Sequence, residues 1–353
     1  MLEFYQKCLK IWFDVLTPKQ LLFFEPMIKK LRKNNQVLCT SRTYHEVVKL
    51  AKVRNVKIIF VGRHGGSDKS EKLKASLERM LHLSTLVNNF APDLTISSCS
   101  PEASRISFGM GIKHIAFSDS PHAEAVMRLC VPFVKKLLIP WIIPKKEFVK
   151  YGISENDIIQ YRTIDAALIV KQKSKNYSKR DFHLKNKKTI LVRVEESQAA
   201  YIQPRKSIST NIIKEIEKKF SNCNIVVLGR YLSESNKLKK EFGNKIIVID
   251  KVVDGKALLR FTDVFIGSGG TMTAEAALMG IPTISYNAVP NRIEEYLVRI
   301  GLVRRETNPK TIIKSVKKIL KSDNQNIRKK AKTTLNSMED PFSKLLTTIR
   351  SVR

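Results

Sequence analysis

Apolar runs of strand length alternate with segments of helical periodicity along most of the 353 residues. In such an order each strand leads into a crossover helix, so neighbouring strands pair in parallel and helices cover both faces of the sheet. The expected strands of the first half are Leu9–Val15, Gln36–Ser41, Lys57–Gly62, Leu94–Cys99, His114–Ser118 and Lys136–Pro140. Those of the second half are Thr189–Val194, Asn224–Gly229, Lys245–Ile249, Val264–Gly267 and Thr283–Tyr286. The pattern predicts an α/β protein with doubly wound parallel sheets.

The length of the chain predicts two domains, because a single hydrophobic core seldom grows beyond about 250–300 residues. Residues 172–188 are polar, rich in lysine and without a long periodic segment, as expected of a linker. We therefore expect a Rossmann-like, acceptor-side domain over 1–171 and a nucleotide-binding domain over 189–325. Basic helices over 326–353 are expected to cross back to the first domain. Ligands of such sheets bind at the carboxyl ends of the strands, which predicts a site in the cleft between the domains.

The chain carries a formal charge of +32, from 64 Lys and Arg against 32 Asp and Glu. This balance favours acidic partners, which include nucleotides, phospholipid head groups and nucleic acid, without choosing among them. The segment Leu129–Tyr151 mixes apolar residues with lysines and can contact an anionic membrane, although a buried strand over Lys136–Pro140 is the favoured interpretation. The lysine-rich tail has no aromatic-rich face, so nucleic acid is disfavoured as a partner.

The five cysteines form neither a CxxC pair nor a Cys/His pattern of zinc ligands. We therefore expect no disulfide framework and no metal site. The first residues lack the layout of a signal peptide, and no run of 18 apolar residues occurs. These features predict a cytoplasmic protein, peripheral to the membrane at most. They leave homo-oligomerisation open.

One turn combines the features of an anion site. An apolar strand leads directly into a helix through four residues, Ser268, Gly269, Gly270 and Thr271. Free backbone N–H groups of the first helical turn point at whatever lies above it, and two glycines permit positive φ and close approach. The hydroxyls of Ser268, Thr271 and Thr273 can donate to phosphate, and Glu275 can reach a ribose. The structural alternative is a tight turn capped by Thr271 with Glu275 as a solvated charge.

Polar groups that can carry acid–base chemistry follow predicted strands of the first half. Asp119, His122 and Glu124 lie just after one strand, and Asp14 lies in the first. Such groups can act as general acid or base, or bond a sugar hydroxyl. Alternatively, Asp119 or Ser120 caps a helix whose first turn exposes His122 and Glu124. As the base we rank Asp119 first, His122 second and Asp14 third.

Three further residues at strand ends are candidate ligand contacts. Arg42 can pair with phosphate or carboxylate, Arg193 can neutralise a diphosphate, and the backbone of Gly229 can approach a base ring. The structural alternatives are a surface position for Arg42 and a pair between Arg193 and Glu195 or Glu196. The chain contains no GxSxG pattern of serine hydrolases and no GxxxxGK[ST] pattern of P-loop kinases. It also lacks the HExxH pattern of zinc proteases and the GxGxxG pattern of nicotinamide enzymes, so all four classes are disfavoured.

The order of these motifs resembles the GT-B superfamily of glycosyltransferases and UDP-N-acetylglucosamine 2-epimerases. More closely, it resembles the uncharacterised prokaryotic family called domain of unknown function 354. The resemblance spans nearly the whole chain and includes Lys10–Asp14, Phe23–Pro26, Thr40–Arg42, Gly62–Gly66, Ser118–Asp119, Arg193 and Gly267–Pro282. It implies the GT-B fold, in which two Rossmann-like domains face a cleft.

The resemblance also implies roles for individual residues. In GT-B transferases the turn matching Ser268–Thr271 cradles the nucleotide diphosphate, and a glutamate matching Glu275 bonds the ribose. In the epimerases a His-Val-Glu-Ala-Gly-Leu-Arg segment resembles His122–Arg128, and its glutamate, matching Glu124, takes part in proton chemistry. Here Val126 replaces the glycine, and the second glutamate that the epimerases pair with the ribose-binding one is absent. Both departures weaken the epimerase assignment.

The sequence thus leads to the hypothesis of a glycosyltransferase-like enzyme. It would bind a nucleotide-diphosphate sugar, such as a UDP-sugar, and transfer the sugar to an acceptor that the sequence does not identify. No cofactor and no obligatory metal are expected. One alternative is an enzyme like UDP-N-acetylglucosamine 2-epimerase, and the other is a non-catalytic nucleotide-binding or polyanion-binding protein of the same fold.

Overall fold

A computed structural model describes residues 8–66, 68–174, 176–195, 207–229, 231–250, 253–286 and 288–352. The chain forms two compact units. The first unit runs to Thr163 and takes in the segment from Glu339 onward, and the second unit runs from Ile164 to Met338. The predicted linker over 172–188 lies in the second unit, and the tail predicted over 326–353 is divided between the two.

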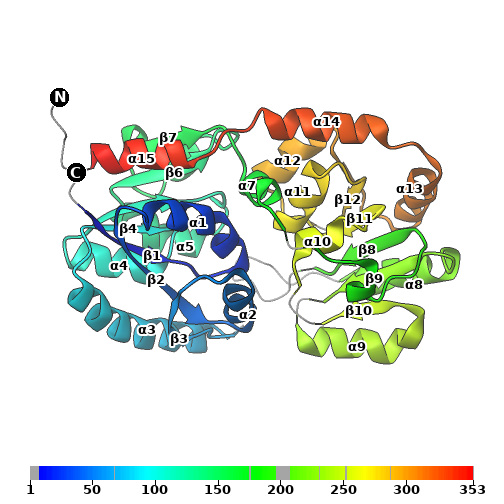
Figure 1. Cartoon of the computed structure of the whole chain (residues 1–353), viewed down its shortest axis with the longest axis horizontal. Coiled ribbons are helices and arrows are strands. Elements are labelled where there is room, and N and C mark those ends of the chain that lie inside the picture. The colour runs from blue at the N-terminus through cyan, green and yellow to red at the C-terminus, as the bar shows by residue number, and fades with distance from the viewer. Residues whose placement is uncertain are drawn as a thin grey trace. The chain divides into compact units, whose positions relative to one another are not determined.

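The first unit is built on a parallel sheet of seven strands in the order β3-β2-β1-β4-β5-β6-β7 (Figure 1). β1 lies centrally, with Trp12 opposite Leu38 on one side and Thr95 on the other. The chain therefore reverses its direction of winding between β1 and β4, which is where such sheets bind ligands. The strands are β1 (Lys10–Asp14), β2 (Gln36–Thr43), β3 (Ile59–Arg63), β4 (Leu94–Ser97), β5 (Lys113–Phe117), β6 (Lys136–Pro140) and β7 (Ile158–Tyr161).

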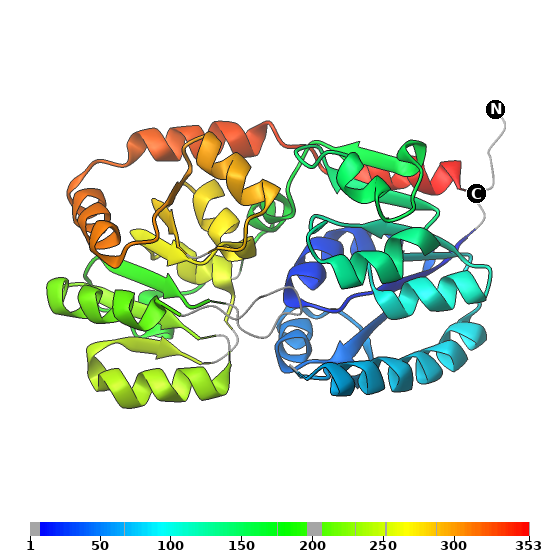
Figure 2. The same cartoon turned by 180° about the vertical axis from the view of Figure 1, so that it is seen from behind.

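Helices cover both faces of this sheet (Figures 1 and 2). Pro18 and Pro101 each stand in the first turn of a helix, where a missing N–H costs nothing, and Thr17 and Ser100 cap these two helices. The core includes four phenylalanine rings in edge-to-face contact, Phe13, Phe23, Phe24 and Phe117. The helices are α1 (Pro18–Leu31), α2 (His45–Arg54), α3 (Lys69–Phe90), α4 (Pro101–Gly109), α5 (Glu124–Cys130), α6 (Lys146–Val149) and α15 (Phe342–Ser351).

The second unit has a parallel sheet of six strands in the order β10-β9-β8-β11-β12-β13. Its winding reverses between β8 and β11. The strands are β8 (Thr189–Arg193), β9 (Asn224–Leu228), β10 (Ile247–Ile249), β11 (Val264–Gly267), β12 (Thr283–Ser285) and β13 (Val303–Arg305). The helices are α7 (Asp165–Lys171), α8 (Ser209–Lys219), α9 (Leu232–Phe242), α10 (Gly255–Leu259), α11 (Gly270–Leu278), α12 (Arg292–Arg299), α13 (Pro309–Lys321) and α14 (Gln325–Asn336).

The α/β class with two parallel sheets is confirmed, and every predicted strand is present with small changes at its ends. The segment Lys136–Pro140 is the buried strand β6, which pairs with β5 and β7 inside the first sheet. Among the described residues, no helix has both the length and the apolar character needed to cross a membrane.

Candidate functional site

The turn between β11 and α11 has the backbone geometry that its glycines predict. Gly269 and Gly270 both adopt positive φ, of 79° and 78°, so two residues in succession occupy a region that disfavours side chains. The helix begins at Gly270, and its N-cap residue, Gly269, has no side chain to bond the first-turn N–H groups. Those N–H groups have no partner within the helix, so they and the helix dipole favour an anion at this position.

The two glycines differ in the room that a side chain would have, which is free at Gly270 and blocked at Gly269. A Cβ atom on Gly269 would lie 2.9 Å from the Cβ of Ala288, whereas one on Gly270 would meet no heavy atom within 4 Å. The hydroxyls of Ser268 and Thr271, both half-buried, make no hydrogen bond to any described residue. Thr273 differs from the expectation, since its buried hydroxyl donates to the Gly269 carbonyl at 2.8 Å. It supports the turn from inside and is not directed at a ligand.

Glu275 lies one helical turn further along α11 and is buried, with 7% of its surface exposed. Burial, followed by the negative charge of Asp254, raises its pKa from the ordinary 4.5 to about 8, although Lys256 and Arg193 act in the opposite direction. The alternative of a solvated first-turn charge is therefore wrong. At pH 7 the carboxyl of Glu275 is mostly protonated, so it can both donate a hydrogen bond to a vicinal diol and accept one from it.

Asp254 and Lys256 are the charged residues with the largest effects on the pKa of Glu275 after burial. Asp254 caps α10 by accepting from the backbone N–H groups of Lys256 and Ala257, at 3.1 and 3.3 Å. The ammonium of Lys256 donates to the carbonyl of Val170 at 2.5 Å and to that of Gln172, at the end of α7. The positive charge is therefore already bound to the negative end of a helix, which weakens its effect on Glu275.

Arg193 is the last residue of β8, so it lies at the same carboxyl edge of the second sheet as the turn between β11 and α11. Its guanidinium donates to the carbonyl of Gly229 at 3.0 Å, and its own carbonyl accepts from the Tyr286 hydroxyl at 3.0 Å. Gly229 thus holds Arg193 in place through its carbonyl. Glu195, which the sequence offered as a partner of Arg193, accepts hydrogen bonds from the Ser207 hydroxyl and from the Ile208 N–H. Glu196, the other predicted partner of Arg193, lies outside the described residues.

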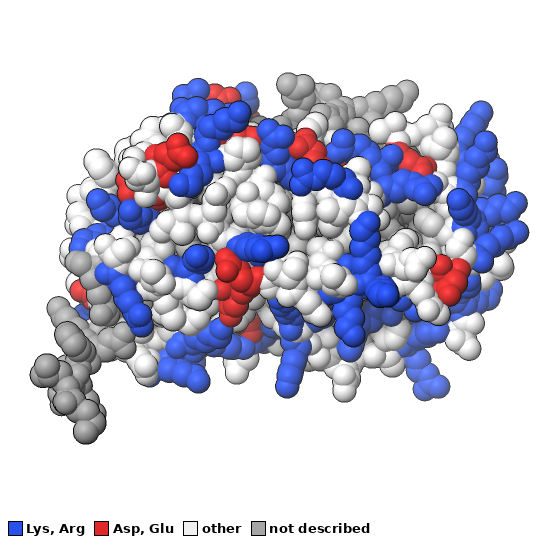
Figure 3. Space-filling model, turned by 90° about the horizontal axis from the view of Figure 1, so that it is seen from above, with Lys and Arg blue, Asp and Glu red and all other residues white. Residues whose placement is uncertain are grey.

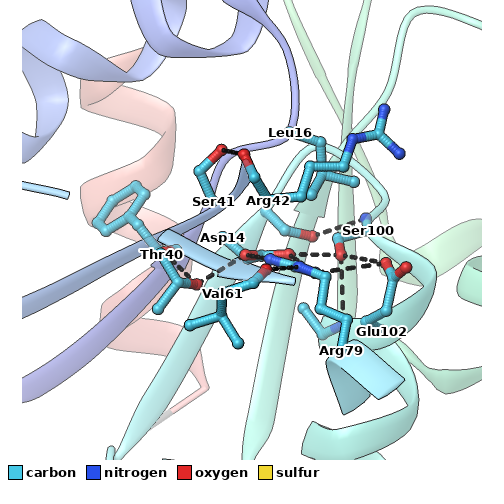
Figure 4. A network of polar contacts seen from close by, with 12 residues as sticks. Asp14, Leu16, Thr40, Ser41, Arg42, Val61, Arg79, Ser100 and Glu102 are labelled. Atoms are coloured by element: carbon cyan, nitrogen blue, oxygen red, sulfur yellow. Dashed lines mark hydrogen bonds and ion pairs between the residues drawn. The ribbon is translucent and has the colours of Figure 1, made fainter. Parts of the chain in front are cut away.

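In the first unit, Asp14 belongs to a buried polar network at the ends of β1, β2 and β4 (Figure 4). Its carboxylate accepts from both terminal nitrogens of Arg79, at 3.2 and 2.5 Å, and from the hydroxyls of Thr40 and Ser100, at 2.6 Å each. Burial alone would raise the pKa of Asp14, but Arg79 and these hydrogen bonds outweigh it and lower the pKa. A carboxylate held in this way is a poor proton acceptor, so the geometry favours a structural role over the predicted role as base.

Arg42 stands beside this network without joining it. In Figure 4 its guanidinium is directed away from Asp14. Its buried Nε has no hydrogen-bond partner, and burial lowers its pKa. Arg79 already occupies the carboxylate of Asp14, and the carboxylate of Glu102 accepts from Ser76 and Ser100 at 2.9 and 3.3 Å. Arg42 is therefore the cation of this group that is available to a phosphate or carboxylate.

The three candidates that follow β5 have different surroundings. Asp119 forms an ion pair with Lys19 of α1 and accepts from the Ser120 hydroxyl at 2.8 Å. Burial opposes ionisation of Asp119, but Lys19 and Ser120 outweigh it and lower its pKa. Burial also lowers the pKa of His122, against the effect of the Asp119 charge, so its imidazole is neutral at pH 7. Glu124 is exposed and pairs with Arg128 one turn along α5, at 2.8 Å.

Asp119 and His122 therefore lie close enough for each to affect the pKa of the other, whereas Asp14 and Glu124 each pair with an arginine. Sequence reasoning missed Arg79, Lys19 and Lys256. The signal for Arg79 was present, because it falls on the buried stripe of α3 formed by Ala75, Leu83 and Val87. A cation on an otherwise apolar stripe requires a buried carboxylate opposite. No comparable signal marks Lys19 or Lys256, whose partners come from distant segments.

Comparison with solved structures gives the fold of the whole chain. UDP-GlcNAc 2-epimerase from Neisseria meningitidis bound to UDP-GlcNAc matches with a TM-score of 0.73 and 14% identity, over 98% of this chain and 100% of that one. The Methanocaldococcus jannaschii UDP-GlcNAc 2-epimerase, in complex with UDP-GlcNAc and UDP, gives 0.68 and 17%, over 89% and 94%. The glycotransferase of kitacinnamycin gives 0.58 and 14%, over 94% and 97%. At these identities the likeness shows the fold alone, and it confirms the expected GT-B-like architecture.

Sequence comparison finds relatives of undefined activity. An uncharacterized protein of Methanocaldococcus jannaschii is 29% identical over 319 residues, which cover 87% of this chain and 91% of the relative. The family described as protein of unknown function (DUF354) matches residues 9–352. The chain therefore belongs to the DUF354 family, as its motifs led us to expect.

Proposed function

We propose that the second unit binds a nucleotide-diphosphate sugar, of which a UDP-sugar is the leading candidate, and that the protein transfers the sugar to an acceptor. The observation that carries the proposal is the start of α11. It combines two positive-φ glycines, an N-terminus without a capping side chain, and a buried carboxyl, that of Glu275, one turn away. Oriented N–H groups suit a diphosphate, and a protonated carboxyl suits a ribose diol.

In the proposed reaction the acceptor oxygen bonds to the anomeric carbon while the bond from that carbon to the diphosphate breaks. The charge that develops on the departing diphosphate is offset by the N–H groups of Gly270 and Thr271, with Arg193 behind them. The acceptor proton passes to a base, for which the neutral imidazole of His122 beside the Asp119 carboxylate is suited. Arg42 provides a positive charge for an anionic group of the acceptor. The proposal includes no obligatory metal.

The test is a thermal-shift screen of nucleotides and nucleotide sugars. A ligand that binds only the native state raises stability by mass action, by about 2.7 kcal/mol at a concentration 100-fold above its Kd. We expect UDP and UDP-sugars to raise the melting temperature and uridine alone to raise it little, because the diphosphate makes the main contacts. If no nucleoside diphosphate of any base shifts the transition, nucleotide binding is refuted.

A substitution at Gly270 tests the position of the diphosphate. Valine there would have positive φ and would fill the open space above the turn, so we expect UDP affinity to fall at least about tenfold, that is by roughly 1.4 kcal/mol. Gly111→Val is a matched control, because Gly111 also has positive φ, 68°, with no heavy atom near its Cβ position. Both variants should lose about 1–2 kcal/mol of stability from backbone strain. Isothermal titration with UDP should separate them, and equal affinities would place the diphosphate elsewhere.

Epimerisation at C2 of a UDP-sugar is the second candidate. It is favoured by the segment His122–Arg128 and by the matches to epimerase structures, which have higher TM-scores than the glycotransferase. Against it, Glu124 is exposed and ion-paired, which is a poor setting for proton abstraction from carbon. The two reactions separate in D2O without acceptor, since only an epimerase introduces solvent deuterium into the sugar. Binding of nucleotide with neither reaction would leave the non-catalytic alternative.

A further inference from the structure

Helices α13 and α14 carry a concentrated positive surface in the second unit. Nine cations and a single carboxylate, that of Asp323, fall between Pro309 and Asn336. All nine side chains are exposed, and we call them the basic face: Lys310, Lys314, Lys317, Lys318, Lys321, Arg328, Lys329, Lys330 and Lys332. Figure 3 shows Lys and Arg gathered at the right-hand end of the view with few acidic residues among them.

The amphipathic pattern of α13 explains why its five lysines point outward together. Ile312, Ile313 and Val316 are buried in the core of the second unit, so the opposite side of the helix must face solvent. The lysines of α13 recur at intervals of four, three, one and three residues, which places them on that opposite side. Anchoring by the apolar residues therefore holds the positive charges in a fixed array.

The basic face is not neutralised by the protein itself. Among the described residues, none of its nine side chains takes part in an ion pair or a side-chain hydrogen bond. Other lysines of the same unit do so, since Lys214 pairs with Glu241 at 2.7 Å and Lys239 with Asp250 at 2.5 Å. Like charges held close together repel, which costs stability unless an external anion is present.

The composition of the face indicates the kind of anion. It has eight lysines and one arginine, whereas recognition of base edges in nucleic acids relies on the planar fork of arginine. Neither helix contains an aromatic residue on which bases could stack. No strongly exposed large apolar residue occurs on these helices, so insertion between acyl chains is not expected. Clustered lysines on an amphipathic helix are suited to the head groups of anionic lipids.

We propose that the basic face of α13 and α14 adsorbs the protein to the surface of an anionic lipid bilayer. The attraction is electrostatic, without insertion, and therefore reversible and sensitive to salt. This inference does not depend on nucleotide-sugar binding, because the residues of the face are distinct from those around α11. The two proposals can therefore fail separately.

The experiment is flotation with vesicles of phosphatidylcholine, with or without phosphatidylglycerol. The test variant carries Lys314→Gln, Lys317→Gln, Lys318→Gln and Lys321→Gln. The matched control removes the same number of charges from exposed lysines of α8 and α9 in the same unit, through Lys218→Gln, Lys219→Gln, Lys237→Gln and Lys240→Gln. Thermal unfolding of both variants confirms that they fold, and a UDP titration checks that the nucleotide site is unaffected.

We expect the wild type to bind vesicles that contain phosphatidylglycerol, to ignore neutral ones, and to detach at 1 M salt, where the Debye length falls to about 3 Å. The test variant should lose at least about tenfold in partitioning, and the control at most about twofold. Equal losses would mean that net charge alone is responsible, and would overturn the proposal. So would absence of binding to anionic vesicles, or binding of a DNA duplex through the same lysines in preference to vesicles.

Discussion

Replacing Arg79 by methionine is expected to lower the free energy of unfolding of the protein by about 3–5 kcal/mol, because it leaves a buried carboxylate uncompensated. Arg79 and Asp14 are 1% and 0% exposed, so solvent cannot take over the role of the lost guanidinium. The Arg79 Nε also donates to the Val61 carbonyl at 3.0 Å, and methionine removes this bond as well. Methionine retains the length of the aliphatic stem, which limits any loss from packing. Urea denaturation provides the measurement.

Two further variants isolate the ion pair from other effects. Arg63→Met removes an arginine that is 50% exposed and paired with Glu71, and it should cost no more than about 1 kcal/mol. Asp14→Asn keeps the shape of the side chain and removes its charge. In that background the cost of Arg79→Met should be clearly smaller, since the carboxylate nearest to Arg79 is no longer charged. Glu102, 3.5 Å from Arg79, keeps its hydrogen bonds from Ser76 and Ser100. The assignment of Asp14 to a structural pair is contradicted if Arg79→Met costs no more than Arg63→Met.

The fold could be read from the sequence because most of its strands are buried on both faces and therefore appear as continuous apolar runs. Two edge strands, β7 and β13, did not have this signature and were missed. In β13 two of three residues are exposed arginines, and β7 contains Gln160, whose amide bonds the carbonyls of Trp141 and Ile143. An edge strand needs only one paired neighbour and tolerates polar residues, so an edge strand with few apolar residues gives no clear periodicity. The edge strands β3 and β10 are mostly apolar and were predicted.

The boundary between the units was less predictable than the strands. The sequence suggested a first domain that ends at 171, whereas α7 belongs to the second unit, where it packs against α11. Six of the seven residues of α7 are buried. Its sequence therefore predicts a core helix, but it does not indicate whether the helix belongs to the core of the first or of the second unit. Composition suggested a polar linker over 172–188, but that segment lies within the second unit, and composition does not identify the partner of a short apolar helix.

The glycine turn was predictable at the level of single residues, since positive φ at Gly269 and Gly270 follows from local chemistry alone. The charge states around it were not. Glu275 occupies a position in the first turns of a helix, where a carboxylate is normally solvated, and its burial depends on α7 and α10 from distant parts of the sequence. The same holds for Asp14, whose partner Arg79 lies 65 residues away.

Glu275→Gln is expected to change the pH dependence of stability. The pKa of Glu275 is raised in the folded protein to about 8, mainly by burial and then by Asp254, from an ordinary value of 4.5. Between these two values the folded state holds a proton that the unfolded state releases, so this group favours folding less and less as the pH rises. Its contribution is fully present below pH 4.5 and is lost by about pH 8. Glutamine remains neutral throughout and does not incur this loss.

The difference in unfolding free energy between Glu275→Gln and the wild type should therefore increase from pH 5 to pH 8, in favour of the variant. Each pKa unit corresponds to about 1.4 kcal/mol, so the increase is expected to be on the order of 2–4 kcal/mol. Chemical denaturation at several pH values measures it. Glu124→Gln, at an exposed position, should follow the wild-type curve and controls for the general loss of a carboxylate. A constant difference across this range would show that Glu275 is ionised at neutral pH, and it would then meet a ribose as a charged acceptor.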